Sequence, residues 1–206
     1  MVKETSALQP DEQFETLIDG LLNREFGVVP DFIGPDLVSG LRANLFRNLE
    51  EGRMHPAGIG RHFNFTQNLK IRGDVICWID NDSEDPFEKA FIDRVRGFAD
   101  YLNRTCYTGI NDFEFHYACY EQGSFYKRHR DQFKTDHGRK FSLVTYLNEN
   151  WAETDEGNLI IYSGEEETRI LPVGGKSVFF RSDETEHEVL PANRMRISIA
   201  GWLKRV

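Results

Sequence analysis

Apolar residues in the first half of the chain recur every three or four positions, which is the pattern of amphipathic helices. Three segments show it, at residues 11–24, 36–51 and 86–103. Asp11 is a candidate N-cap for the first of them. Before the third, Asp85 as N-cap, Pro86 as the first helical residue and Glu88 form a complete start signal. We expect the apolar stripes of these helices to pack against a sheet.

From about residue 112 onward the pattern changes to short apolar runs separated by turn residues, which is typical of β-strands. Two earlier runs, Phe26–Pro30 and Ile71–Ile79, also predict strands, the first at a sheet edge or end because proline cannot donate to a ladder. The later region has eight runs: Phe113–Tyr120, Ser124–Arg128, Phe141–Leu147, Asn158–Tyr162, Thr168–Leu171, Ser177–Phe180, His187–Leu190 and Met195–Leu203. The expected fold class is therefore α+β, mainly β, with N-terminal helices supporting a sandwich or jelly-roll core.

A chain of 206 residues fits one domain. We expect residues 1–10 to be loose, residues 11–111 to supply helical support and residues 112–206 to form the core. Within the support region, residues 52–70 lack apolar periodicity and are rich in glycine, histidine and arginine. A loop of this length in a compact domain is often functional. Its two histidines have no carboxylate at a useful spacing, so we interpret them as loop residues and not as metal ligands.

Composition narrows the functional class. A net charge of −9 argues against nonspecific binding to nucleic acid or a membrane surface, and no apolar run is long enough to span a bilayer. The N-terminal residues lack the apolar core of a signal peptide, and three cysteines without Cys-x-x-Cys spacing are typical of reduced thiols. We therefore expect a cytoplasmic protein with no nucleic-acid or membrane partner. A monomer is the default expectation, because the sequence does not identify the oligomeric state.

The candidate chemistry begins with a His-x-Asp pair, His129 and Asp131. Such a pair alone is as readily a solvated loop. A distant second histidine, His187, lies at the start of a predicted strand. Two histidines and one carboxylate are the ligand set of non-haem Fe(II) oxygenases, and three protein ligands on one face leave the other metal positions open.

Arg196 lies nine residues after His187 and strengthens this interpretation. In the last predicted strand, alternation places four residues on one face: Arg196, Ser198, Ala200 and Trp202. An arginine that shares a face with alanine and tryptophan points into the barrel, and a buried guanidinium requires an anionic partner. A dicarboxylate fits this arrangement, with one end on the metal and the other paired with Arg196.

Four stretches of sequence extend the pattern. They are Ile71-Arg72-Gly73-Asp74 with Trp78-Ile79, Ala118-Cys119-Tyr120 with Tyr126, His129 and Asp131, Gly138-Arg139 with Tyr146-Leu147-Asn148 and Trp151, and His187-Glu188-Val189 with Arg196 and Trp202. Through them the chain, from about residue 68 to 206, resembles the 2-oxoglutarate, Fe(II)-dependent dioxygenases with a double-stranded β-helix core. Within that family it is similar to prolyl hydroxylases of the oxygen-sensing type and their bacterial relatives.

The resemblance implies roles for individual residues. The implied iron ligands are His129, Asp131 and His187. The residues implied to bind the 2-oxoglutarate cosubstrate are Arg196, Tyr146, Tyr120 and Ser198. The residues implied to contact substrate at the mouth are Asp74, Tyr126, Arg139 and Trp202. Without the resemblance, the tyrosines read as strand aromatics, Arg139 as a turn residue and Trp78 as part of the core.

Two departures from the animal oxygen sensors stand out. The segment between Tyr120 and Tyr126 is one residue shorter, and Ala200 stands where those enzymes have a hydroxyl residue. Neither position ligates iron in the family. Both bear on cosubstrate hydration and oxygen kinetics, so the resemblance does not by itself imply oxygen sensing.

The implied activity is hydroxylation of a prolyl residue in a protein substrate, with Fe(II), 2-oxoglutarate and O2, release of succinate and CO2, and L-ascorbate as a supporting reductant. The bacterial relatives imply a translation factor such as elongation factor Tu. Residues 126–140 carry six basic and two acidic side chains, which favours an anionic partner or cosubstrate steering. Two alternatives stay open: a 2-oxoglutarate oxygenase acting on another side chain, a small molecule or a nucleobase, and a non-catalytic jelly-roll binding module.

Overall fold

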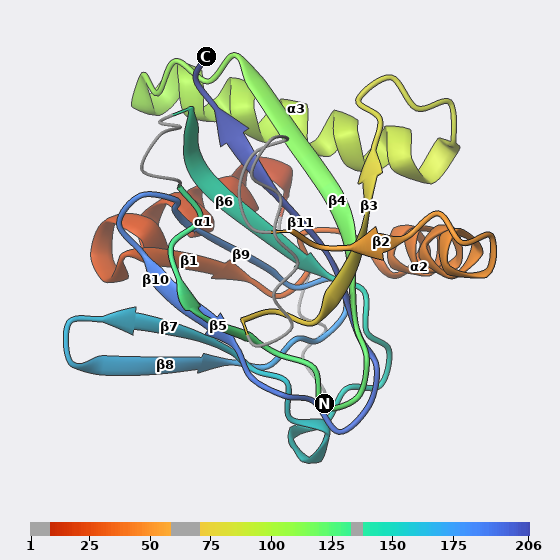
Figure 1. Cartoon of the computed structure of the whole chain (residues 1–206). Coiled ribbons are helices and arrows are strands. Elements are labelled where there is room, and N and C mark those ends of the chain that lie inside the picture. The colour runs from red at the N-terminus through yellow and green to blue at the C-terminus, as the bar shows by residue number, and fades with distance from the viewer. Residues whose placement is uncertain (1–8, 59–70, 133–137) are drawn as a thin grey trace, which may run out of the picture.

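The computed structural model describes residues 9–58, 71–132 and 138–206, and its helices lie where the apolar stripes predict them (Figure 1). The α-helices are α1 (Pro10–Arg24), α2 (Pro35–Glu50) and α3 (Pro86–Cys106), and a short 3-10 helix, η1, spans Glu153–Asp155. None of the helices in these described ranges is both long enough and apolar enough to cross a bilayer.

The two predicted helix starts have different outcomes. α3 begins as predicted, because Asp85 accepts hydrogen bonds from the backbone N–H groups of Phe87 and Glu88 at 3.0 and 3.1 Å. α1 begins one residue earlier than predicted. Pro10 is its first residue, and Asp11 lies in its first turn instead of at the N-cap. The fixed φ of proline and its missing N–H favour it at the first helical position, so the N-cap is Gln9, two residues before Asp11.

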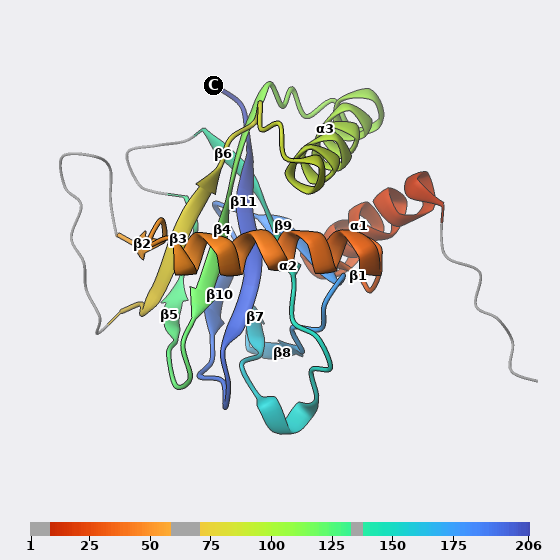
Figure 2. The same cartoon turned by 90° about the vertical axis from the view of Figure 1, so that its right-hand side faces the viewer.

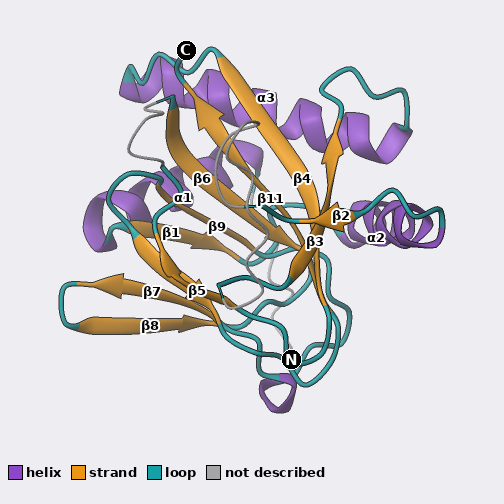
Figure 3. Cartoon of the chain, in the orientation of Figure 1, coloured by secondary structure: helices purple, strands orange, loops and turns teal. Residues whose placement is uncertain are grey.

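The strands form two antiparallel sheets (Figure 3). The strands of the larger sheet are β1 (Phe26–Val29), β2 (His55–Pro56), β3 (Asp74–Ile79), β4 (Asp112–Tyr120), β6 (Arg139–Tyr146), β9 (Ser177–Arg181) and β11 (Arg196–Lys204). Those of the smaller sheet are β5 (Tyr126–His129), β7 (Leu159–Ser163), β8 (Glu166–Ile170) and β10 (Glu186–Val189). Their orders are β1-β9-β6-β11-β4-β3-β2 and β5-β10-β7-β8. All eight strands predicted after residue 112 are present, and the jelly-roll fold class is confirmed.

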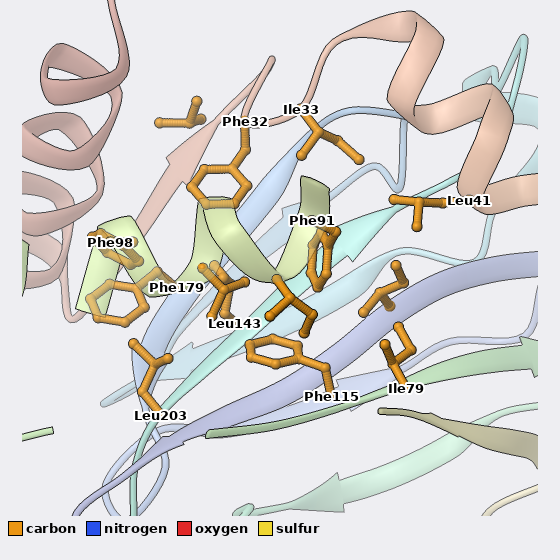
Figure 4. Packing of buried hydrophobic residues seen from close by; sticks show 14 of the residues in the cluster. Phe32, Ile33, Leu41, Ile79, Phe91, Phe98, Phe115, Leu143, Phe179 and Leu203 are labelled. Carbon is orange, nitrogen blue, oxygen red and sulfur yellow. The ribbon is translucent and has the colours of Figure 1, made fainter. Parts of the chain in front are cut away.

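The three helices cover one face of the larger sheet (Figure 2). Their apolar side chains and those of the sheet form one continuous core, in which Leu41 and Phe91 from the helices meet Phe115, Leu143 and Phe179 from the strands (Figure 4). All five are fully enclosed, and burial of side chains of this size contributes about 1.5–3 kcal/mol each. The opposite face of the sheet and the smaller sheet enclose a second apolar cluster, and the functional cavity lies between them.

One short strand was not predicted. β2 pairs His55 with Ile76 and Pro56 with Val75 of β3. Both β2 side chains are exposed, so backbone hydrogen bonds hold this strand pair together. Such bonds do not require apolar side chains, and the sequence therefore shows no apolar periodicity here. The rest of the predicted loop, residues 59–70 with its second histidine, lies outside the described residues, and the loop interpretation stays a prediction there.

Asn148 fixes the start of β11. Its side chain is 2% exposed. Its Oδ1 accepts a hydrogen bond from the backbone N–H of Ile197 at 2.7 Å, and its Nδ2 donates to the carbonyl of Pro172 at 2.7 Å. Asn148→Ala would leave both buried backbone groups unpaired, at about 1–3 kcal/mol each. We expect the free energy of unfolding, measured with urea, to fall by about 2–4 kcal/mol.

Asn111→Ala is the matched control. The Asn111 amide also bonds to a backbone N–H and a carbonyl, both of Val206, but at an exposed position where water replaces the lost partners. Its loss should stay below about 1 kcal/mol. Equal losses for the two variants would show that the buried amide of Asn148 has no special part in holding β11.

Candidate active site

A cavity of about 590 Å³ opens between the two sheets, which is within the size range of small-molecule sites. The four residues that alternation placed on one face of β11 all line it: Arg196, Ser198, Ala200 and Trp202. Ile197 and Ile199, on the opposite face, belong to the core under the helices. Along β11, the alternation predicted from the sequence therefore distinguishes the side chains that line the cavity from those that belong to the core.

His129, Asp131 and His187 come together in the lining of this cavity, and each offers a ligand atom within 4.8 Å of the others. Oδ1 of Asp131 lies 3.4 Å from Nε2 of His129 and 3.7 Å from Nε2 of His187. The strand pairing explains how two distant histidines meet. In the β5–β10 ladder, His129 is directly opposite His187, so their side chains project from the same face.

Backbone carbonyls orient both imidazoles. Nδ1 of His129 lies 2.7 Å from the carbonyl oxygen of Lys127, and Nδ1 of His187 lies 3.3 Å from that of Thr185. A carbonyl oxygen only accepts, so each Nδ1 carries the proton and each Nε2 keeps its lone pair. Both lone pairs thus belong to the nitrogens nearest Asp131, which is the arrangement that a metal ion requires.

The charge state of the cluster also fits a metal. Oδ2 of Asp131 accepts a hydrogen bond from Oγ of Ser142 at 2.7 Å, which leaves Oδ1 for the histidine side. Burial alone would raise the pKa of the Asp131 carboxyl, but His187, His129 and the Ser142 hydrogen bond hold it well below its usual range. Burial lowers the pKa of His187 to about 4. An ionised carboxylate and a neutral imidazole are the protonation states in which these groups bind Fe(II).

Arg196 is a buried cation in the wall of the same cavity, 1% exposed. Its Nε donates to the carbonyl of Gly157 at 2.9 Å, and within the described ranges no carboxylate lies at ion-pair distance from it. Its Cζ is 5.2 and 5.1 Å from the ring centroids of Tyr120 and Tyr146. A buried guanidinium of this kind requires an anion, which the described parts of the chain do not supply.

Tyr146 offers a second donor beside Arg196. Its hydroxyl is buried and has no hydrogen-bond partner among the described residues. Burial raises the pKa of Tyr146 to about 12, so the phenol keeps its proton at neutral pH. Together, the guanidinium and the phenol are two donors suited to one carboxylate.

Three of the four residues implied to contact substrate line the cavity: Tyr126, Arg139 and Trp202. The Tyr126 ring stacks on the iron-ligand candidate His129 with 3.5 Å between centroids. The Arg139 Cζ lies 3.4 Å from the ring centroid of Trp202, and its Nη2 is 2.8 Å from Oε1 of Glu114. An ion pair and an aromatic face therefore fix Arg139 in place.

Asp74 does not itself line the cavity, and its implied contact with substrate stays a prediction. Its side chain is enclosed, and Arg72 donates to both carboxylate oxygens at 2.7 and 2.6 Å. Arg72 belongs to one of the four resembling stretches but had no implied role. It lines the cavity and lies over the Tyr126 ring. Asp74 therefore acts on the cavity by holding the Arg72 side chain in the cavity wall.

Two further cavity residues were missed or misread. Trp78 was interpreted as core, but it lines the cavity and is 53% exposed. His116, not singled out at all, lines the cavity and is buried. Alternation along the strands carries the signal for both, since Trp78 follows Ile76 and His116 precedes Ala118 at spacing two on cavity-facing sides.

The basic segment 126–140 is less positive in space than in sequence. Arg128 and Arg130 both pair with Glu186 of the neighbouring strand β10. Arg139 pairs with Glu114. These acids come from other strands, so a count along one segment overstates the charge at the mouth.

His116 predicts an acid-sensitive stability. Burial lowers its pKa from 6.5 to about 3, and the charges of Arg72 and Arg139 act in the same direction. Between these values the unfolded chain binds the proton and the folded chain does not, so stability falls as the pH drops. We expect the metal-free wild type to lose roughly 1 kcal/mol more than His116→Gln per pH unit from about pH 6 to 5, measured with urea. His55→Gln, at an exposed position, should track the wild type; a His116→Gln profile that also tracks it would contradict the assignment.

Comparison with known proteins agrees with this geometry. A family model described as the 2OG-Fe(II) oxygenase superfamily matches residues 115–204, which include the triad and Arg196. A prolyl-4-hydroxylase from Pseudomonas putida is 34% identical with a TM-score of 0.84, over 94% of this chain and 99% of that one. A prolyl hydroxylase from Trichoplax adhaerens, in complex with a hypoxia inducible factor oxygen degradation domain peptide fragment, is 25% identical with a TM-score of 0.85, over 95% and 90%.

A third structure shares the fold at lower identity. The viral collagen prolyl hydroxylase from Paramecium Bursaria Chlorella virus-1, as a 2OG complex, is 18% identical with a TM-score of 0.64, over 89% of this chain and 98% of that one. The family assignment rests on the Pseudomonas putida relative, which this chain matches over nearly its whole length. This chain therefore belongs to the 2OG-Fe(II) oxygenase superfamily and is similar in sequence and structure to its prolyl hydroxylases.

Proposed function

We propose that this protein hydroxylates a prolyl residue of a protein substrate, using Fe(II), 2-oxoglutarate and O2, and releases succinate and CO2. The observation that carries the proposal is Arg196, a buried guanidinium with no carboxylate partner in the described ranges, in the wall of the cavity that the His-Asp-His triad also lines. A dicarboxylate that reaches from Arg196 to a metal at the triad satisfies both features. The 34% identity to a prolyl-4-hydroxylase supports a prolyl target.

In this proposal His129, Asp131 and His187 hold the iron through Nε2, Oδ1 and Nε2. The bound iron and cosubstrate together supply the oxygen chemistry, in which one oxygen atom enters succinate and the other enters the substrate as a hydroxyl. The protein's part is orientation and exclusion of water. Arg196 and Tyr146 would fix the distal carboxylate of 2-oxoglutarate, and the enclosed side chains of Tyr120 and Ser198 line the same cavity.

At the mouth, aromatic rings and fixed cations suit a polypeptide containing proline. Tyr126 and Trp202 contribute aromatic rings to the cavity lining, and an arginine lies over each ring. Arg139, held by Glu114, and Arg72, held by Asp74, present donors that carbonyl groups accept from. Because both cations are already paired, their positions are set before substrate arrives, which lowers the entropic cost of binding.

The test is a search for the product in proteins. Purified protein is incubated with Fe(II), 2-oxoglutarate and ascorbate, first with elongation factor Tu and then with a bacterial lysate, and peptides are mapped by mass spectrometry. We expect one added oxygen atom on a prolyl residue, dependent on 2-oxoglutarate, with 4-hydroxyproline on amino-acid analysis. Oxygen added reproducibly to a different residue type, or to none, would overturn the prolyl assignment.

A further inference from the structure

His116 forms an aromatic cluster with two tryptophans in the cavity wall. Its ring centroid is 5.0 Å from that of Trp78 and 5.5 Å from that of Trp202, and the two indoles are 6.3 Å apart. The three come from the neighbouring strands β3, β4 and β11, where Trp78 and Ala200 both pair with His116. The cluster thus places one imidazole beside two indoles that also contact each other, in the lining of the proposed substrate cavity.

The two ring nitrogens of His116 have different surroundings. Nδ1 is buried and has no hydrogen-bond partner among the described residues. His116 nevertheless contributes to the cavity lining, so the opposite edge of the ring, with Nε2, is the one that meets the cavity. A neutral imidazole carries its proton on one nitrogen, and an enclosed N–H without an acceptor is the costlier choice. The favoured tautomer is therefore Nε2–H.

We propose that His116 is a specificity-determining residue whose Nε2–H donates a hydrogen bond to a backbone carbonyl of the substrate polypeptide beside the target proline. The proposal rests on the proposed prolyl hydroxylase function. A prolyl residue has no backbone N–H, so recognition of its main chain by hydrogen bonds needs donors on the enzyme. The two indoles beside His116 supply apolar ring surface for the prolyl ring.

The ring is suited to a neutral acceptor. Burial and the nearby Arg72 and Arg139 lower the pKa of His116 to about 3, so it carries no charge at neutral pH. The guanidinium of Arg196 is the better hydrogen-bond donor for a carboxylate. Among the donors of this cavity, His116 is thus matched to a peptide carbonyl and not to the anionic cosubstrate.

Two substitutions separate hydrogen bonding from shape. His116→Gln keeps an N–H donor at similar reach, whereas His116→Met keeps similar volume without a donor. With elongation factor Tu, or the substrate found in lysate, His116→Met should raise KM about tenfold, which converts to about 1.4 kcal/mol, as expected for one lost neutral hydrogen bond. His116→Gln should stay within about threefold of wild type. The affinity of the Mn(II)-loaded variants for 2-oxoglutarate should not change.

The tautomer is measured independently of any substrate. Nitrogen-15 NMR of the histidine side chains, with His116 assigned by its loss in His116→Gln, should show the proton on Nε2. A proton on Nδ1, equal KM increases in both variants, or weakened binding of 2-oxoglutarate would each overturn the proposal. Failure of the wild type to hydroxylate any prolyl residue would overturn the proposed function first, and the tautomer would still report on His116 itself.

Discussion

Replacement of Arg196 by alanine should weaken binding of 2-oxoglutarate about a hundredfold while iron binding changes little. A hydrogen bond to a charged group contributes about 1.5–3 kcal/mol, and loss of one partner of a buried ion pair costs about 3–5 kcal/mol. Each 1.4 kcal/mol is a factor of about ten in affinity. The measurement is titration of 2-oxoglutarate into Mn(II)-loaded wild type and variant.

Two further variants show whether the cosubstrate contacts are those proposed. Arg196→Lys should recover part of the affinity, because it keeps the charge but not the planar pair of donors. Tyr146→Phe should cost about tenfold, since it removes one neutral donor to a charged acceptor. Binding by Arg196→Ala within about threefold of wild type would mean that the guanidinium supports the fold and does not hold the cosubstrate.

Asp131→Ala should abolish conversion of 2-oxoglutarate to succinate while the protein stays folded. The substitution removes the one carboxylate of the proposed metal site. Loss of a residue that only orients a ligand typically costs 10- to 100-fold in metal affinity or activity. Removal of a direct ligand should therefore cost at least about 100-fold. Succinate release measures turnover, Fe(II) titration measures affinity and thermal unfolding checks the fold.

Two further substitutions serve as comparisons for Asp131→Ala. Ser142→Ala removes the hydrogen bond to Oδ2 of Asp131 and should reduce iron affinity by about 10- to 100-fold, leaving the ligands in place. Asp82→Ala, at an exposed position in the turn between β3 and α3, should leave turnover unchanged. Wild-type turnover by Asp131→Ala would refute the triad.

Local chemistry made most of the fold predictable from the sequence. The start of α3 is encoded in two adjacent residues, Asp85, whose side chain caps the helix, and Pro86, which is its first residue. The strands after residue 112 are short, apolar and bounded by turns, and every one is present. Alternation along β11 placed Arg196 on the cavity side before any pairing was known. These features depend on neighbours within a few residues, which a sequence displays directly.

The rest depends on partners far apart in the chain. His116 carries no motif, and its contacts with Trp78 and Trp202 arise from the pairing of three strands. The Glu186 pairs that offset Arg128 and Arg130 arise in the same way. Register between distant strands sets such contacts, and single-strand periodicity does not specify it.

The central claim is that this cavity couples oxidation of 2-oxoglutarate to hydroxylation of a prolyl residue. The most direct measurement incubates the purified Fe(II) enzyme with 2-oxoglutarate, isotopically labelled O2 and the protein substrate, and quantifies both products. The account predicts succinate and hydroxyproline in equal molar amounts, with labelled oxygen from O2 in both. Hydroxyproline without succinate, or succinate release that no prolyl-containing substrate stimulates, would contradict it.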